Sequence, residues 1–126
     1  MHRVLCLFCL LGMMTTAIAA QDTDKALDGK FLSLSAGVIG STLFDTETTF
    51  RGLTKCSCYE ANPVLSPFIS AGRPAAYAFE TGMDGVALFS AFKLRKMHSK
   101  VWWLPATAVV GMHIWLGSRN LQLTRR

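Results

Sequence analysis

Two carboxylates lie within an apolar part of this 126-residue chain, where an ionised side chain is costly. Glu80 and Asp84 fall inside the stretch 74–92, which is otherwise apolar apart from a few small or polar residues. An Asp at the centre of a membrane helix costs roughly 2.5–3.5 kcal/mol, so such residues need a partner or a function. Like charges four residues apart on a helix also repel. We therefore expect one of the two to be protonated or paired with Arg73, which shares their helical face.

Further groups that can bind metals or protons are spread along the chain. Asp45, Glu60 and His113 join Asp84 and Glu80 if the helices that carry them pack together. Carboxylates with an imidazole are suitable ligands for zinc, manganese or iron, and they can also relay protons. No close metal-binding spacing such as His-x-x-x-His is present. The hypothesis of a divalent metal held by Asp45, Glu60, Asp84 and His113 therefore depends on tertiary packing.

The densest polar motif runs from Asp45 to Pro63. Thr48 and Thr49 lie three and four residues after Asp45, which places their hydroxyls on the helical face of that carboxylate. Pro63 disfavours the α conformation at Asn62, and Asn62 followed by Pro63 is a typical start for a new helix. Capping explains Asn62 and Pro63 but leaves Glu60 free to pair with a nearby Arg or Lys.

These residues carry a family resemblance. The pattern resembles a widespread group of small bacterial membrane proteins that have an Asp-x-x-(Ser/Thr)-Thr helix, then Glu-Ala-Asn-Pro, then two apolar helices. The matching positions are Asp45, Thr48, Thr49, Glu60, Ala61, Asn62, Pro63 and Asn120. The resemblance covers most of the chain after the first twenty residues. It implies a helical membrane fold and no assigned activity, and Glu80 departs from it because a Lys often stands there.

The N-terminus has the features of a secretory signal. A basic start at Arg3 leads into the apolar run 4–14, and small residues follow at Ala17 and Ala19. We predict a signal peptide over 1–19 with cleavage after Ala19, the alternatives being cleavage after Ala20 and an uncleaved anchor. The remaining residues, 20–126, are predicted to form a single helical membrane domain.

Two apolar helices are predicted to span a bilayer. The first covers about 74–92 and the second 101–118, with the basic run 93–100 between them. The positive-inside rule places that run in the cytoplasm of a bacterial cell, which leaves the N-terminal segment on the outer side of the inner membrane. Trp102 and Trp103 suit a membrane interface, and Pro105 is early enough to be tolerated in a helix.

An earlier helix is predicted over 30–53. Its uncharged part, 31–44, is too short to cross about 30 Å of hydrocarbon, so we expect an interfacial or partly inserted helix, with a third span as the alternative. Small residues recur every four positions at Ser33, Gly37 and Ser41, and again at Ala36 and Gly40. Such stripes allow close helix packing in membranes. The expected fold class is therefore all-α, with about three helices after the signal.

Several functional classes are excluded by the motifs. The chain contains no Ser-His-Asp order, phosphate-binding loop or dinucleotide fingerprint. Its net charge of +5 is concentrated in the 93–100 run and at the C-terminus, which indicates topology signals and not a nucleic-acid surface. Cys56 and Cys58 are interpreted as ordinary loop thiols, with a redox or copper role as the alternative.

We expect a non-enzymatic integral membrane protein that acts through helix packing with itself or a membrane partner in the lipid bilayer. The alternative is a small membrane metal-binding protein or metal-dependent enzyme.

Overall fold

The computed structural model describes residues 26–56 and 59–124, and all secondary-structure elements within these ranges are helices. Helix α2 is Gly29–Cys56, α3 is Ser66–Ser70, α4 is Arg73–Lys96 and α5 is Leu104–Thr124. The predicted all-α class is confirmed for this part of the chain. The predicted signal peptide lies outside the described residues, and so do the side chains of Cys56 and Cys58.

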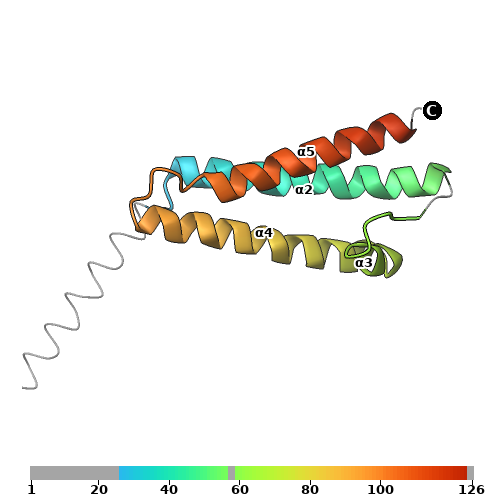
Figure 1. Cartoon of the computed structure of the whole chain (residues 1–126), viewed down its shortest axis with the longest axis horizontal. Helices are drawn as coiled ribbons and strands as arrows, with labels where there is room; N and C mark the ends of the chain where they lie inside the picture. Colours follow the sequence, from blue (N-terminus) through green and yellow to red (C-terminus); the bar gives the residue numbers. More distant parts are fainter. Residues whose placement is uncertain (1–25, 57–58, 125–126) are drawn as a thin grey trace, which may run out of the picture.

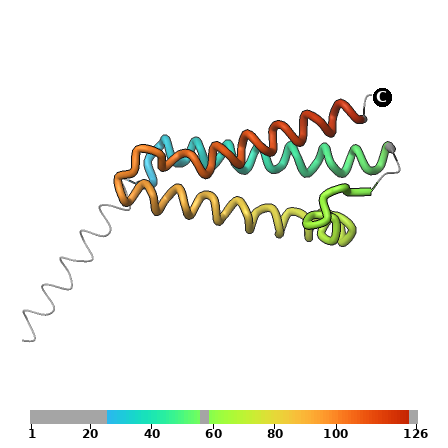
Figure 2. Tube along the Cα trace, viewed as in Figure 1, coloured from blue at the N-terminus to red at the C-terminus, as the bar shows by residue number. Residues whose placement is uncertain are grey.

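The three long helices form an elongated bundle (Figure 1). Helix α5 runs along α2 in the same direction, α4 packs against both in the opposite direction, and α3 packs beside the start of α4. The chain trace in Figure 2 shows that the start of α2 lies at the same end of the bundle as the loop between α4 and α5. The helix predicted over 30–53 therefore packs on the other two, as expected.

Local side chains explain where the helices begin. Asp28 Oδ1 accepts hydrogen bonds from the backbone N–H groups of Lys30 and Phe31, at 2.9 and 3.1 Å, and thereby caps α2. Gly72, with φ of 98°, precedes α4 in a conformation that disfavours other residues. Pro105 is the second residue of α5, so the prediction that it is tolerated at a helix start is confirmed.

The end of α4 has an unusual residue in the left-handed region. His98 has φ of 55°, a conformation that the last turns of helices usually assign to glycine. It directs the chain so that the backbone N–H of Ser99 donates to the carbonyl of Leu94 at 3.0 Å. This turn brings the basic loop back over the start of α2, where Arg95 is hydrogen bonded to Asp28.

An apolar core occupies this same end of the bundle. Phe31, Val38, Ala91 and Ala106 are its buried residues, drawn from all three long helices. The ring of Phe31 lies 6.2 Å from that of Phe92 and 6.3 Å from that of Trp102, measured between centroids. Small alanines on α4 and α5 let these helices approach α2 closely here.

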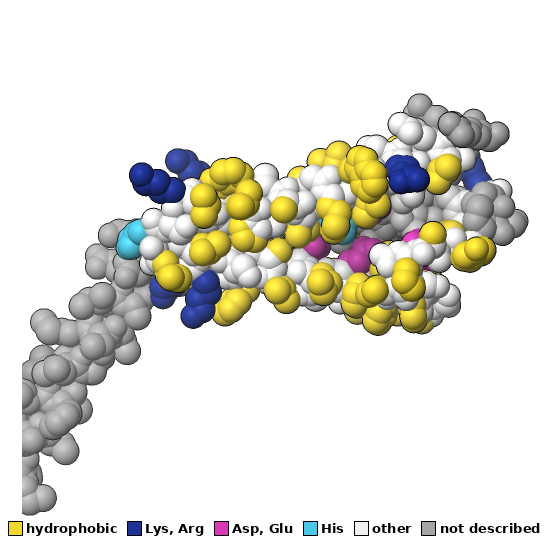
Figure 3. Space-filling model, in the orientation of Figure 1, with side chains coloured by type: hydrophobic (Ala, Val, Ile, Leu, Met, Phe, Trp, Pro, Cys, Tyr) yellow, Lys and Arg dark blue, Asp and Glu magenta, His cyan; other side chains and the backbone are white. Residues whose placement is uncertain are grey.

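The rest of the interior is polar. Buried polar residues among those described are Ser41, Thr42, Asp45, Thr46, Thr48, Thr49, Glu80, Asp84 and His113. The outer surface is largely apolar, and Ile39, Val86 and Trp115 are 57%, 62% and 60% exposed. Figure 3 shows hydrophobic side chains over the middle of one face, with Lys and Arg towards the ends. Buried titratable side chains and exposed large apolar ones are the two features of this distribution that need an explanation.

None of the described helices combines the length and the apolar content needed to cross a membrane. The insertion of these helices into a membrane therefore stays a prediction at this point. The predicted small-residue stripe is correct in part: Ser41 is buried and a Cβ at Gly37 would lie 3.9 Å from Val110 on α5, whereas Ser33, Ala36 and Gly40 are exposed. The inward face of α2 is instead marked by Val38 and the polar residues that follow it.

Candidate functional site

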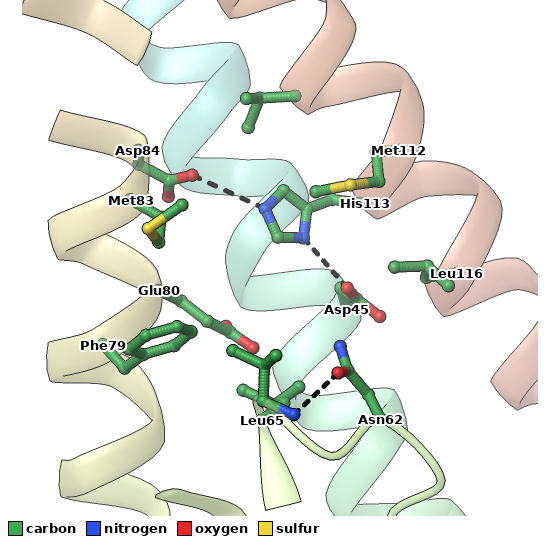
Figure 4. Close-up of a pocket in the computed structure, with 12 residues that line it drawn as sticks. Asp45, Asn62, Leu65, Phe79, Glu80, Met83, Asp84, Met112, His113 and Leu116 are labelled. Atoms are coloured by element: carbon green, nitrogen blue, oxygen red, sulfur yellow. Dashed lines mark hydrogen bonds and ion pairs between the residues drawn. The ribbon is translucent and has the colours of Figure 1, made fainter. Parts of the chain in front are cut away.

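A histidine joins two carboxylates at the centre of the polar interior. His113 Nδ1, on α5, lies 2.9 Å from Asp45 Oδ2, on α2. Its other ring nitrogen, Nε2, lies 3.5 Å from Asp84 Oδ1, on α4. Each of the three side chains is at most 8% exposed. One imidazole thus connects all three long helices, and Figure 4 shows both of its nitrogens directed at carboxylates.

Two threonines one turn apart on α2 contact the carboxylates of α4. Thr42 Oγ1 lies 2.6 Å from Asp84 Oδ2 and 3.0 Å from the carbonyl oxygen of Val38. Thr46 Oγ1 is hydrogen bonded to Glu80 Oε2 and lies 2.8 Å from the carbonyl oxygen of Thr42. Each hydroxyl therefore lies between a backbone carbonyl and a carboxyl group.

The number of hydrogens available at these contacts bears on the protonation of the carboxyl groups. A threonine hydroxyl has one hydrogen to donate, and a carbonyl oxygen has none. Thr46 can be bonded to both of its neighbours at once only if the Glu80 carboxyl group supplies the second hydrogen. Thr46 has no exposed surface, so water cannot supply it. A Glu80 carboxyl group that carries a proton satisfies both contacts of Thr46.

Charge balance leads to the same conclusion. Asp45, Glu80 and Asp84 are each about 94–95% buried, and His113 is the only group in their surroundings that can carry a positive charge. No Lys or Arg among residues 26–56 and 59–124 pairs with them. Uncompensated buried charges cost several kcal/mol each. His113 contacts Asp45 and Asp84 but not Glu80, so burial favours the neutral form of the Glu80 carboxyl group.

Asn120 completes the environment of Asp45. Its side-chain nitrogen donates to Thr49 Oγ1 at 2.8 Å and lies 3.4 Å from Asp45 Oδ1. Asp45, Thr49 and Asn120 are three of the positions that carry the family resemblance. In the sequence, Asn120 follows Thr49 by 71 residues and Asp45 by 75 residues. Thr48, in contrast, donates to the carbonyl oxygens of Phe44 and Asp45 on its own helix.

The predicted partner of the Glu80 and Asp84 pair is wrong. Arg73 Nε lies 3.0 Å from Glu47 Oε1, and the Tyr77 hydroxyl donates to the same oxygen at 2.9 Å. Arg73 begins α4 and its side chain is half exposed, so it reaches Glu47 on α2 near the bundle surface. Helical spacing places Arg73 on the same face of α4 as Glu80 and Asp84, but about two and three turns away from them along the helix.

Glu60 also differs from the prediction. It lies in the loop after α2, where its Oε1 accepts a hydrogen bond from the backbone N–H of Asn62 at 2.8 Å. It is therefore separate from Asp45, Asp84 and His113. Asn62 Oδ1 accepts from Val64 N–H at 3.0 Å, and the Asn62 carbonyl accepts from Ser66 N–H at 2.9 Å. The predicted helix start at Asn62 and Pro63 is therefore wrong: Asn62 caps a turn that starts at Pro63, and the next helix, α3, begins at Ser66.

A cavity of about 370 Å³ adjoins the cluster. Three of the buried titratable groups, Asp45, Glu80 and Asp84, lie on its wall together with His113. Asn62 of the loop before α3 also lines the cavity (Figure 4), and apolar side chains from this loop, α4 and α5 complete the lining. These are Val64, Leu65, Phe79, Met83, Val109, Met112 and Leu116.

Gly117 sets the distance between α2 and α5 beside the cluster. A Cβ atom at this position would lie 2.6 Å from two ring carbons of Phe44 and 3.2 Å from the Cα of Asp45. Only glycine therefore permits the observed approach. Because His113 is one turn before Gly117 on the same face, this contact also brings the imidazole within reach of Asp45.

The described part of the chain contains no group of three or more His, Cys, Asp or Glu side chains placed to hold a metal ion. Both ring nitrogens of His113 already face carboxylates, so the imidazole offers no free ligand atom. The structure brings together Asp45, Asp84 and His113 as predicted, but His113 is hydrogen bonded to Asp45 and ion-paired with Asp84, and Glu60 lies apart from them.

Sequence reasoning missed Thr42 and Thr46 as site residues. A signal was present, since Thr42, Asp45, Thr46 and Thr49 recur at helical spacing on one face of an otherwise apolar helix. That polar stripe marks the inward face of α2 more reliably than the glycines did.

Comparison of the chain with models of protein families, with curated proteins and with solved structures finds no match.

Proposed function

We propose that this chain is a small, non-enzymatic bacterial membrane protein whose three long helices enclose a proton-carrying polar core and present apolar outer faces to lipid and to a second copy or a membrane partner. The observation that carries the proposal is the distribution of polarity. Polar and titratable side chains fill the part of the interior beyond the apolar core, while many large apolar side chains are exposed on the outside. In membrane proteins, polar residues face the bundle interior and pair there, because hydrocarbon cannot solvate them.

Each long helix contributes to the apolar outer surface. Leu32, Ile39 and Leu43 on α2 are 59%, 57% and 49% exposed. Met83, Val86 and Phe89 on α4 are 58–62% exposed, and Ile114 and Trp115 on α5 are 50% and 60% exposed. Large apolar surfaces of this kind mark contacts with lipid or protein partners. The bundle as a whole, and not any one helix, is the unit that fits an apolar environment.

The ends of the bundle suit the two aqueous sides. Lys93, Arg95 and Lys96 lie in the last turn of α4, and basic side chains gather at both ends of the face in Figure 3. The positive-inside rule places the α4–α5 loop in the cytoplasm. Because Arg95 binds Asp28, the start of α2 lies on that same side of a fully inserted bundle. This differs from the sequence-based placement of the N-terminal segment on the outer side.

Tryptophan fluorescence in vesicles tests the proposal. Trp115 is half way along α5, about 16 Å from the first residue of that helix, whereas Trp103 lies in the loop before it. Two single-tryptophan proteins are compared, one retaining Trp115 and one retaining Trp103, with Phe at the other tryptophans. Bromine atoms deep in the acyl chains should quench Trp115 more than Trp103, and bromines near the headgroups should do the reverse.

The contrary result is equally clear. If the protein is folded, with the helical circular dichroism of the wild type, and neither tryptophan is quenched by brominated lipid, it does not insert and the proposal is wrong. Equal quenching of both by shallow bromines alone would place the bundle on the membrane surface, which also contradicts an enclosed core within lipid.

A further inference from the structure

We propose that the cavity beside Glu80 binds a small organic ammonium ion with an apolar body, and that binding releases the proton of the Glu80 carboxyl group to solvent. The reaction is an exchange in which the neutral carboxyl group loses a proton and its carboxylate pairs with the incoming N–H group. Charge in the site is therefore conserved. Nothing is oxidised or reduced, and no covalent bond to the ligand forms.

The first support is an unused hydrogen-bond acceptor. Glu80 is 6% exposed, and its Oε2 is bonded to Thr46. Its other carboxyl oxygen, Oε1, has no hydrogen-bond partner among the described residues, although the side chain lines the cavity. Among the described side chains only Arg95 Nη1 is both sealed from solvent and unpaired, so Glu80 Oε1 is reachable from the cavity and can accept a hydrogen bond there. A ligand N–H group is a suitable donor.

The second support is the chemistry of the walls. Phe79, Met83, Met112 and Leu116 surround the opening, and they provide aromatic and thioether surfaces. Such side chains attract organic cations and adapt to ligands of different shape. A cavity of about 370 Å³ is within the range of sites for small molecules. A hydrated metal ion would gain nothing from these apolar walls.

The sign of the charge selects a cation. The titratable groups that face Glu80 are Asp45 on α2, Asp84 on its own helix and His113 on α5. No Lys or Arg among the described residues joins this group. A carboxyl group can release its proton and so match the charge of a cation, whereas no described Lys or Arg lines the cavity to match an anion. Because the ammonium then supplies the missing positive charge, Glu80 no longer needs its proton.

Calorimetry and proton release test this inference. Benzylammonium is titrated into the full-length protein in mild detergent and weak buffer, with benzyl alcohol as the neutral analogue of similar shape. We expect benzylammonium to bind, to release up to one proton per molecule bound as reported by an indicator dye, and to bind at least about tenfold more tightly than the alcohol.

Two variants locate the effect. Glu80→Gln should weaken benzylammonium binding about tenfold or more and abolish proton release. The matched control is Glu47→Gln, which changes an acidic residue at the bundle surface and should leave both measurements unchanged. If Glu80→Gln does not fold, Leu116→Trp fills the cavity without touching the carboxyl groups and should abolish binding.

The inference is overturned if benzyl alcohol binds as tightly as benzylammonium, or if Glu80→Gln retains the affinity and the proton release of the wild type. It is also overturned if Leu116→Trp binds benzylammonium as tightly as the wild type does. Absence of binding by the folded wild-type protein up to millimolar benzylammonium also rejects it.

Discussion

Replacement of Gly117 by alanine should separate α2 from α5 at the polar cluster. The new Cβ would lie 2.6 Å from the Phe44 ring and 3.2 Å from the Cα of Asp45, whereas carbon atoms pack at about 3.5–4.0 Å. The ring and the helix must therefore yield by roughly 1 Å. The Asp45 to His113 contact, now 2.9 Å, would lengthen beyond hydrogen-bonding range if the backbone takes up this shift.

The cost can be measured against a matched control. Overpacking of this kind costs about 1–3 kcal/mol. Gly111 lies on the same helix, and a Cβ there meets nothing within 4 Å. The intrinsic gain of up to about 1 kcal/mol for alanine over glycine in a helix applies to both positions and cancels in their difference. Gly117→Ala should therefore be about 1–3 kcal/mol less stable than Gly111→Ala.

The assay is unfolding in mixed micelles with an increasing fraction of denaturing detergent, followed by far-ultraviolet circular dichroism. A second substitution, Phe44→Leu, removes the ring that the new methyl group meets and should restore part of the loss in Gly117→Ala. If Gly117→Ala is as stable as Gly111→Ala, or if Phe44→Leu gives no rescue, then the close approach does not position the cluster.

Three more substitutions test separate contacts, each by the same unfolding assay. Asp45→Asn should cost about 3–5 kcal/mol because it leaves His113 without its charged partner, whereas Glu47→Gln, in a half-exposed pair, should cost under about 1 kcal/mol; the reverse ranking would contradict the assigned core. His98→Gly should raise stability by about 1 kcal/mol because φ is 55° there, and an equal gain from His98→Ala would refute the backbone argument. The hydrogen bond from Arg95, and to a smaller extent that from the Phe31 N–H, lowers the pKa of Asp28. The contribution of Asp28 to the free energy of unfolding is therefore present above about pH 4 and is lost as the pH falls through the lowered pKa. Asp28→Asn should lack this contribution at every pH.

The helices themselves follow from local sequence. The apolar stretches predicted over 30–53, 74–92 and 101–118 all become helices, extended by a few residues at most of their ends. Capping groups such as Asp28 and the turn at Asn62 and Pro63 act within a few residues of the chain, so sequence alone can indicate them. The short helix α3 was not predicted because five residues give no periodic signal.

Pairing across the bundle was decided by tertiary structure. Sequence placed Asp45, Asp84 and His113 among candidate residues, but it equally allowed Glu60, which bonds within its own loop. Sequence also suggested that Arg73 pairs with Glu80, whereas the position of α2 places Glu47 next to Arg73. Spacing fixes the face of a helix on which a side chain lies, but not which level of a neighbouring helix stands opposite that face.

The same limit applies to the cavity, the close approach at Gly117 and the question of which small residues on α2 face α5. All three depend on how far one helix is rotated and shifted against another. That choice is made by the summed contacts of three helices, including the hydrogen bonds of Thr42 and Thr46 to carboxyl groups more than thirty residues away. The amino-acid sequence by itself therefore determined the helices and the residues able to carry protons. Only packing determined which of those residues share a site, because hydrogen bonds of this kind require atoms within about 3 Å.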